Sequence, residues 1–257
     1  MQNNYLNEGM ILELSNIAKS FGNKVVLKDV SFQLNIGSIS ILMGVNGSGK
    51  TTLFNIISGF LNPDSGEISL NKKEIKGIRE YKINRRGVSR TFQDLRLIGN
   101  LTVRENILLA FPNQQGEKWW KILIPNKKVK QEQETNNIKA NEILKICFIE
   151  DIAESKASEI SYGQQKLLNL SCAIANDSEV LLLDEPVAGV NQTYRDKLVS
   201  VIKNIKAEGK SILIIEHNTD FIEAVADRLF FLNEGKIMEF ESYENLRNDK
   251  IVQEAYI

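Results

Sequence analysis

The stretch GVNGSGKTT at residues 44–52 has the residue types and the spacing of a loop that binds phosphate. Glycine lets the backbone approach a phosphate closely, because a Cβ would block that approach. Lys50 can reach the β- and γ-phosphates of a nucleotide, and the Thr51 hydroxyl can ligate Mg²⁺. A glycine-rich turn without a ligand is the alternative. The residues that we expect to bind a nucleotide through this loop are Gly44, Asn46, Gly47, Ser48, Gly49, Lys50, Thr51 and Thr52.

Two carboxylates end the apolar run VLLLDEP at residues 180–186. The carboxyl ends of buried strands are where α/β sheets bind ligands, so both acids are expected at a ligand site. Asp184 is predicted to hold Mg²⁺ through water. Glu185, beside it, could orient and deprotonate a water that attacks a γ-phosphate. The alternative is a strand whose end carries solvated charge.

His217 is the only histidine of the chain and ends another apolar run, SILIIEH at residues 211–217. A single histidine in such a place is usually a satisfied hydrogen-bonding residue. We expect its strand to neighbour the strand of Asp184, and this placement favours a role beside the γ-phosphate.

The stretch ISYGQQKLLNL at residues 160–170 places a serine and a glycine at the start of an amphipathic helix. Leu167 and Ile174 share the apolar face of this helix, so we expect its first residues to point outward. Ser161 and Gly163 would then present a hydroxyl, backbone N–H groups and the positive end of the helix dipole. This pattern predicts an anion site whose anion is not held by the same chain; a plain helix N-cap is the alternative.

The surrounding pattern predicts the elements that position these side chains. Residues 11–44 alternate as strands do and finish in an all-apolar run that leads into the phosphate loop. From residue 161 onward helices alternate with buried strands, which favours a parallel sheet with helices on its faces. Residues 76–158 are expected to be mostly helical, with an irregular insert at 113–137. Residues 228–241 read as a hairpin, and a helix closes the chain.

Composition limits the class of protein. Of the 257 residues, 42% are hydrophobic and 25% charged, which fits one large globular domain or two small lobes. The net charge of −1 favours neither nucleic acid nor anionic lipid as a partner. No leader is visible, and no apolar run approaches the roughly 18 residues of a membrane span, so a soluble chain is expected. Cys147 and Cys172 are expected to be reduced, buried thiols.

Five motifs in order resemble the nucleotide-binding domain of ABC transporters over nearly the whole chain. They are the phosphate loop, Gln93 in RTFQ, the Ser-x-Gly-Gln element at 161–164, the VLLLDEP strand and the strand-end His217. The resemblance implies an α/β fold of the P-loop NTPase class and ABC type. It further implies one domain over 1–257 with a mixed sheet core, an antiparallel β subdomain and a helical subdomain at roughly 94–176.

The resemblance also implies a role for each matching residue. Phe21 would stack on the adenine of ATP, and Gln93 would sense Mg²⁺ and the attacking water and link to a membrane partner. Two such domains would face each other head to tail, so that residues 161–164, here called the signature segment, close on the ATP of the other domain. Residues 188–191, here called the dimer loop, would meet that other subunit. The implied catalytic residues are Glu185 as general base, His217 as a γ-phosphate contact, Gln93 and Lys50; the implied Mg²⁺ ligands are Thr51, Gln93 and Asp184; the implied contacts to the opposite ATP are Ser161, Gly163 and Gln164.

Departures from the usual ABC pattern narrow the subtype. The signature segment reads Ser-Tyr-Gly-Gln after Ile160 where Leu-Ser-Gly-Gly-Gln is usual, and Asn191 replaces the usual aspartate of the dimer loop. These variants, the long insert and the ending IVQEAYI resemble the ATPases of branched-chain amino acid importers. The implied protein acts on the cytoplasmic face of the plasma membrane. It would bind permease subunits, pair with a second ABC ATPase or with itself, and be served indirectly by a periplasmic solute-binding protein.

Two other functions stay open. An exporter ATPase of the lipopolysaccharide-transport type is expected to lack so long an insert. A non-transport ABC ATPase that drives a soluble assembly is expected to carry coiled coils, a zinc hook or tandem domains, and the sequence displays none of them. Within the insert, packing of Trp119 and Trp120 onto the helical lobe is favoured over a direct contact with the membrane subunit. The sequence does not name the solute, because such an ATPase does not touch it.

Overall fold

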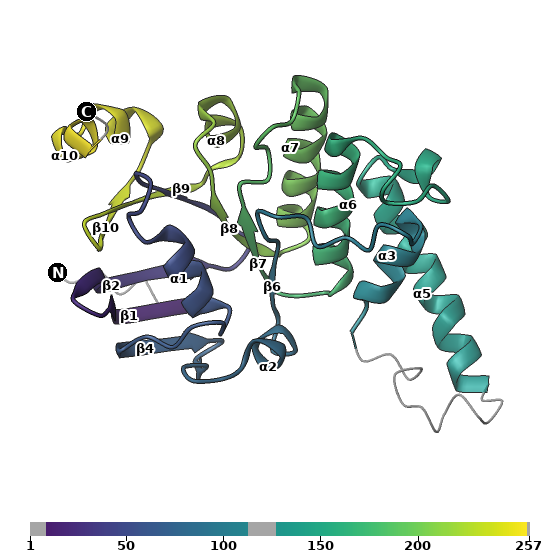
Figure 1. Cartoon of the computed structure of the whole chain (residues 1–257), viewed down its shortest axis with the longest axis horizontal. Coiled ribbons are helices and arrows are strands. Elements are labelled where there is room, and N and C mark those ends of the chain that lie inside the picture. The colour runs from purple at the N-terminus through teal and green to yellow at the C-terminus, as the bar shows by residue number, and fades with distance from the viewer. Residues whose placement is uncertain (1–8, 113–126, 256–257) are drawn as a thin grey trace. The chain divides into compact units, whose positions relative to one another are not determined.

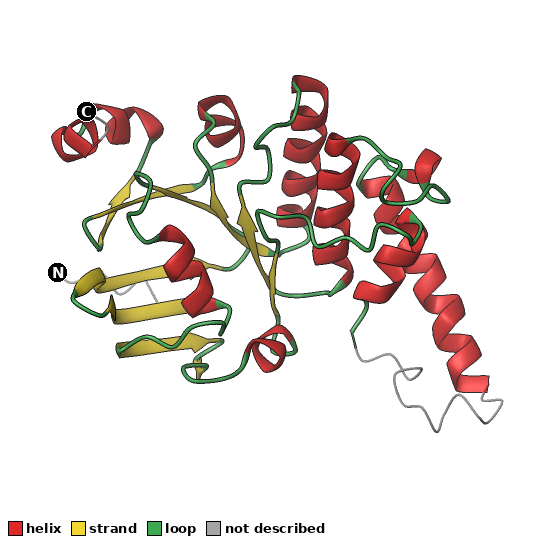
Figure 2. Ribbon diagram, in the orientation of Figure 1, coloured by secondary structure: helices red, strands yellow, loops and turns green. Residues whose placement is uncertain are grey.

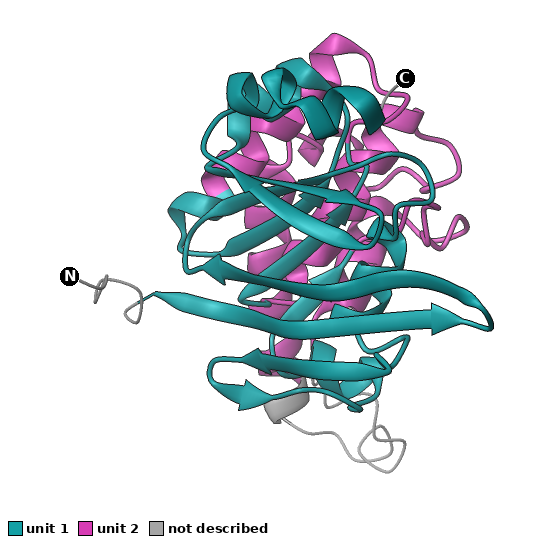
Figure 3. Ribbon diagram, turned by 90° about the vertical axis from the view of Figure 1, so that its left-hand side faces the viewer, with its two compact units in different colours: residues 1–90, 178–186, 205–257 teal, residues 91–177, 187–204 magenta. Residues whose placement is uncertain are grey.

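The computed structural model describes residues 9–112 and 127–255 (Figure 1). The chain divides into two compact units (Figure 3). The first unit contains Met1–Arg90, Ser178–Pro186 and Ile205–Ile257, and the second contains Thr91–Asp177 and Val187–Asn204. The chain therefore passes between the units four times. The single domain over 1–257 and its helical subdomain remain predictions.

A four-stranded antiparallel sheet forms one layer of the first unit. Its order is β2-β1-β4-β5, with β1 at Met10–Phe21, β2 at Lys24–Asn35, β4 at Ser65–Leu70 and β5 at Lys73–Glu74. Leu12 and Leu14 of β1 are buried and pair with Leu70 and Ile68 of β4. These apolar residues recur every second position, so they cover one face of the sheet.

A six-stranded sheet in the order β10-β9-β3-β8-β7-β6 forms the second layer of this unit. All its neighbouring strands are parallel except β9 (Arg228–Asn233) and β10 (Lys236–Phe240). Every residue of β3 (Ile39–Met43), β7 (Val180–Asp184) and β8 (Ser211–Ile215) is buried, as expected of strands covered on both faces. Because β8 pairs with both β3 and β7, the carboxyl ends of these three strands lie side by side.

Figure 2 shows the helices and the strands of both sheets. Helix α1, Lys50–Ile57, contributes Leu53 and Phe54 to a core that contains residues of both sheets. The other helices of this unit are α2 at Glu80–Asn84, α8 at Thr219–Val225, α9 at Tyr243–Asn248 and α10 at Lys250–Ala255. Mixed and antiparallel sheets around a shared core confirm the predicted α/β class.

The second unit is helical. It contains α3 (Val103–Ala110), α5 (Lys127–Ile146), the 3₁₀ turn η2 (Glu150–Ile152), α6 (Tyr162–Ala175) and most of α7 (Gln192–Ala207). Helices α3, α5 and α6 pack on one another. Within residues 9–112 and 127–255, no helix has the length and apolar character that a membrane crossing requires.

Both cysteines lie in the second unit as free thiols. Burial raises the pKa of Cys147 and of Cys172 to about 12. Both thiols therefore stay protonated and weakly nucleophilic at neutral pH.

The segment predictions have mixed outcomes. The hairpin is confirmed, since Asn233 of β9 pairs with Lys236 of β10. The prediction that 76–158 is mostly helical is wrong in part. Residues 88–90 form β6, a buried strand that extends the sheet beside β7, and 91–101 form neither helix nor strand. The described end of the supposedly irregular insert, from Lys127, is helical, whereas Trp119 and Trp120 lie outside the described residues.

Candidate functional site

The phosphate loop connects the buried strand β3 to α1. Gly44 has a φ of 149°, and a Cβ on it would lie 2.3 Å from the carbonyl oxygen of Leu232. Any larger residue would push against the backbone of β9, so glycine is required here. Gly49, with a φ of 109°, precedes the first residue of α1. The chain thus turns from a strand end directly into a helix N-terminus, as a phosphate loop must.

Lys50 lies inside this loop. Its Nζ donates hydrogen bonds to the carbonyl oxygens of Gly44, at 2.6 Å, and Val45, at 2.9 Å. Burial lowers the pKa of Lys50, while the negative charges of Glu185 and Asp184 act in the opposite direction. The ammonium group therefore gains from any further negative charge that enters the loop.

The loop has features that suit a phosphate ligand. Ser48 is buried, and its hydroxyl has no hydrogen-bond partner among the described residues. A buried hydroxyl without a partner costs free energy, which a phosphate oxygen would recover. A pocket of about 420 Å³ opens on residues 46–48 and has Lys24 and Lys28 on its wall. These cations and the hydroxyl fit a nucleotide phosphate.

Asp184 and Thr51, two of the three residues predicted to hold Mg²⁺, are of types that fit that ion. Within the part of the chain that the structure describes, no group of three or more His, Cys, Asp or Glu side chains could hold a metal. Mg²⁺ does not need one, because it commonly binds one or two carboxylates together with the phosphates of a substrate. Asp184 at the end of β7 supplies such a carboxylate, and exposed Thr51 supplies a hydroxyl in the first turn of α1.

Glu185 has an unusual backbone conformation. Its φ is 48°, in the left-handed region, and its N–H donates to the carbonyl oxygen of Ile215 at 3.0 Å. The hydrogen bond holds the residue after β7 against the end of β8. About a quarter of the Glu185 side chain, 27%, is exposed, so its carboxylate can meet a water molecule.

His217 lies beside this carboxylate. Its Nε2 is 3.9 Å from Glu185 Oε1, too far for a direct hydrogen bond but close enough for both to contact one ligand. The buried Glu216 accepts hydrogen bonds from the backbone N–H groups of His217, at 2.7 Å, and Asn218, at 3.1 Å. The predicted neighbouring of the His217 and Asp184 strands is confirmed, because Asp184 pairs with Ile215. Glu216, which fixes the loop that carries His217, was not among the predicted site residues.

The signature segment begins α6 with a capping box. Ser161 Oγ accepts a hydrogen bond from the Gln164 N–H, and Gln164 Oε1 accepts one from the Ser161 N–H at 2.8 Å. Leu167 and Leu170 are buried, which confirms the apolar face of the helix. The N-cap is therefore formed within the chain, and the role of this segment toward a second chain remains a prediction.

Two predicted residues lie apart from these groups in the sequence. Phe21 ends β1 and is 51% exposed, and Lys19 Nζ lies 5.6 Å from the centroid of its ring. Gln93 is exposed and lies in the second unit, three residues after the end of β6. Their roles toward adenine, Mg²⁺ and a membrane partner remain predictions.

Comparison with known proteins decides the family. A family model described as ABC transporter matches residues 27–188, which is more than half of the chain. The chain belongs to the ABC transporter family. The ABC ATPase is 33% identical over 247 residues to the probable branched-chain amino acid transport ATP-binding protein LivG of Archaeoglobus fulgidus, with 96% of this chain and 95% of the relative covered.

Solved ABC structures agree with this assignment. The crystal structure of a nucleotide-free ATP-binding cassette from an ABC transporter has a TM-score of 0.83 and 33% identity, with 96% of this chain and 99% of that chain covered. The ADP conformation of an ATP-binding cassette of an ABC transporter has a TM-score of 0.82 and 31% identity, with 97% and 99% covered. The predicted family and fold class are confirmed.

One buried cation of this ABC ATPase was not predicted. Arg90 ends β6, and its Nη2 lies 3.2 Å from Asp184 Oδ2, with both side chains less than one-tenth exposed. Its Nη1 donates to Asn55 Oδ1, at 2.6 Å, and to Ser58 Oγ, at 3.2 Å. Arg90 therefore connects the proposed metal-site carboxylate with α1 and the residue that follows it. Arg90 and Asp184 stand far apart in the sequence, and one arginine at a strand end carries no signal of such a pair.

We expect Arg90→Met to lower the free energy of unfolding by about 3–5 kcal/mol, because the Asp184 charge stays buried without this partner. The double variant Arg90→Met/Asp184→Asn should recover most of the loss. Denaturant titration of the nucleotide-free chain measures both. The single variant Asp184→Asn completes the comparison. If the losses of unfolding free energy in Arg90→Met and Asp184→Asn simply added in the double variant, Arg90 and Asp184 would not be energetically coupled.

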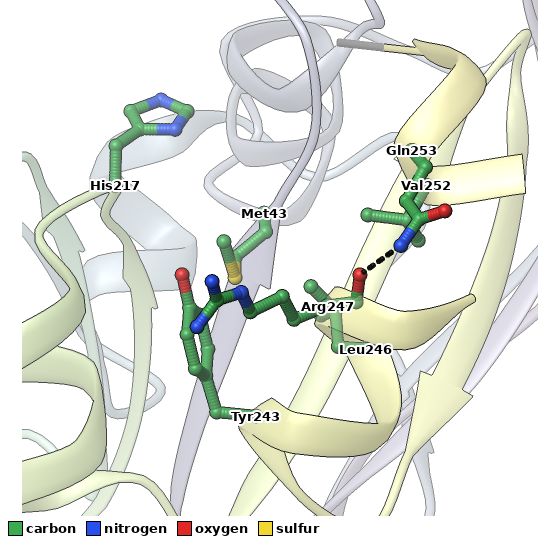
Figure 4. A pocket seen from close by; sticks show the side chains of 7 residues that line it. All are labelled: Met43, His217, Tyr243, Leu246, Arg247, Val252 and Gln253. Carbon is green, nitrogen blue, oxygen red and sulfur yellow. Dashed lines mark hydrogen bonds between the residues drawn. The ribbon is translucent and has the colours of Figure 1, made fainter. Parts of the chain in front are cut away.

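The C-terminal helices of the ABC ATPase border His217. A pocket of about 620 Å³ is lined by Met43, His217, Tyr243, Leu246, Arg247, Val252 and Gln253 (Figure 4). The Tyr243 hydroxyl and Thr219 Oγ1 are 2.9 Å apart, so α9 is hydrogen-bonded to the start of α8. Gln253 Nε2 donates to the carbonyl oxygen of Arg247 at 3.0 Å and joins α10 to α9. The closing helices thus support the loop that carries His217.

Proposed function

We propose that the chain is the ATP-binding and ATP-hydrolysing subunit of an ABC importer for a small polar solute, a branched-chain or related amino acid. One observation carries the proposal: the phosphate loop, the Asp184–Glu185 pair and His217 lie at the carboxyl ends of three neighbouring strands of one sheet. A phosphate site, a carboxylate base and a polar partner for the base are the parts that hydrolysis of the bond between the β- and γ-phosphates of ATP needs. Import is supported by relatives named as branched-chain amino acid transport ATP-binding proteins.

Each residue then has a chemical task. Lys50 donates to phosphate oxygens in place of the loop carbonyls to which it is now bonded. Mg²⁺, when held by Thr51, Asp184 and Gln93, supplies positive charge to the phosphates. Glu185 orients the attacking water and accepts its proton, and His217 contacts the γ-phosphate.

The working assembly is a head-to-tail dimer of this chain with itself or with a related ABC ATPase. Phe21 stacks on the adenine of the bound ATP, and the signature segment of the opposite subunit closes on its γ-phosphate. Closure moves the region of Gln93 against cytoplasmic loops of permease subunits, and hydrolysis reopens the dimer. The subunit thus works on the inner face of the plasma membrane, and a periplasmic solute-binding protein delivers the solute to the permease.

Affinity purification from detergent-solubilised native membranes tests this function. We expect a tagged chain to retain integral-membrane permease subunits, and we expect the solute-binding protein encoded with them to bind leucine, isoleucine or valine in a calorimetric assay. Recovery of lipopolysaccharide-export components would support the exporter alternative. Recovery of a soluble assembly alone would support the non-transport alternative.

A further inference from the structure

Two tyrosine–glycine contacts join the signature segment to the dimer loop and the start of α7. A Cβ on Gly163 would lie 2.5 Å from Cδ2 of the Tyr194 ring. A Cβ on Gly189 would lie 3.2 Å from Cε1 of the Tyr162 ring. The Tyr194 ring of α7 thus packs on Gly163 of the signature segment, and the Tyr162 ring of the signature segment packs on Gly189 of the dimer loop. All four residues belong to the second unit.

Hydrogen bonds reinforce this packing. Ser161 Oγ donates to the Tyr194 hydroxyl at 3.4 Å while it accepts from the Gln164 N–H. The Tyr194 N–H in turn donates to Asn191 Oδ1 of the dimer loop at 3.1 Å. Lys197 Nζ lies 5.4 Å from the centroid of the Tyr194 ring, on the same helix. Neighbouring residues therefore contact the ring and the hydroxyl of Tyr194, and a hydrogen bond to Asn191 fixes its backbone N–H.

We propose that Tyr194 is a positioning residue for the phosphate-facing end of the signature segment. Its ring fixes the first turn of α6 through Gly163, and its hydroxyl sets the orientation of the Ser161 side chain. The proposal rests on the proposed function, in which Ser161 faces the γ-phosphate of the opposite subunit.

The chemistry of two hydroxyl groups explains how Tyr194 would act. A serine hydroxyl has one proton to donate and two lone pairs that accept. In the chain alone, the Ser161 hydroxyl donates a hydrogen bond to the Tyr194 oxygen. When Ser161 donates to a phosphate oxygen instead, Tyr194 O–H donates to Ser161, so the hydrogen bond reverses and Ser161 keeps its orientation. The charge-assisted hydrogen bond from Ser161 to the phosphate polarises the Ser161 hydroxyl, and this strengthens the hydrogen bond that Ser161 accepts from Tyr194.

A size exchange in the nucleotide-free chain tests the packing. Gly163→Ala should lower Tm by about 2–10 °C, because the new Cβ overpacks against the Tyr194 ring. In a Tyr194→Ala background the same Gly163→Ala should lower Tm by less than half as much. An equal loss in both backgrounds would contradict the steric contact.

A single-atom change tests the positioning role. Tyr194→Phe keeps the ring, and water can replace the lost hydroxyl at exposed Ser161, so Tm and the ATP affinity of the single chain should not change. In a Glu185→Gln background, ATP-driven dimerisation of the chain, alone or with the ATPase subunit that co-purifies with it, should weaken about fivefold per Tyr194 site. Tyr194→Ala should weaken it further. Tyr81→Phe is the matched control, since Tyr81 is exposed on α2, and it should leave dimerisation unchanged.

The outcomes separate the two proposals. If the Glu185→Gln parent does not dimerise with ATP, the proposed trans site fails, and the positioning role fails with it. If the parent dimerises and Tyr194→Phe dimerises equally well, the positioning role alone is overturned. A fall in dimerisation with unchanged Tm and ATP affinity supports both.

Discussion

Glu185→Gln is expected to bind ATP with unchanged affinity and to lose about 10²–10⁴ in the rate of hydrolysis. The amide has nearly the shape of the carboxylate but cannot accept the proton of the attacking water. Equilibrium binding of ATP and release of inorganic phosphate measure the two quantities separately. The variant should also accumulate as an ATP-bound dimer, because closure no longer ends in hydrolysis.

Glu208→Gln provides the matched control for this experiment. Glu208 is exposed in the turn between α7 and β8, so Glu208→Gln removes one negative charge, as Glu185→Gln does, but away from the carboxyl ends of β3, β7 and β8. Its phosphate release should equal that of the unmodified protein. Undiminished phosphate release by Glu185→Gln would refute the assignment of Glu185 as the base. His217 would then be the candidate for the group that orients the water.

Ser161→Arg is expected to leave ATP binding by the same chain intact and to prevent ATP-driven dimerisation. The long side chain would occupy the space in front of the helix start, and the substitution also removes the hydroxyl of the capping box. Loss of such a cap costs about 1 kcal/mol locally. Analytical ultracentrifugation in the Glu185→Gln background, with and without ATP, measures the effect.

The cap and the trans contact can be separated. Ser161→Asn restores a capping side chain of moderate size and should recover the stability of α6 without recovering full dimerisation. Ser200→Arg places the same cation on an exposed position of α7 and should leave dimerisation unchanged. Complete dimerisation of Ser161→Arg would rule out the trans role of the signature segment.

Local motifs determined how much could be predicted. The phosphate loop, Asp184 and Glu185 were predictable because strand, turn and reactive residues are contiguous in the sequence. The placement of His217 followed from the alternation of strands and helices, which implies a parallel sheet. Residues 88–90 were not recognised as a strand, because three residues in a polar stretch give no period of two.

Residues that act across the fold were missed. Arg90 and Tyr194 contact partners 94 and 33 residues away in the sequence, and no spacing rule links such pairs. One local signal did exist for Tyr194. Gly163 is the second residue of α6, where glycine is a poorer helix former than alanine, and the missing Cβ lets another group approach the helix closely. The approaching group could be found only from the folded chain.

The left-handed backbone of Glu185 has a consequence for attempts to make the protein more heat-resistant. A non-glycine residue at a φ of 48° costs about 1–2 kcal/mol, whereas glycine or asparagine adopts this conformation at less cost. Selection for thermal resistance alone would therefore favour replacing the glutamate, and the hardened variants would lose the proposed base. Screens of this protein thus need a turnover measurement beside every melting curve, because a substitution of Glu185 that raises thermal stability would lower the rate of ATP hydrolysis.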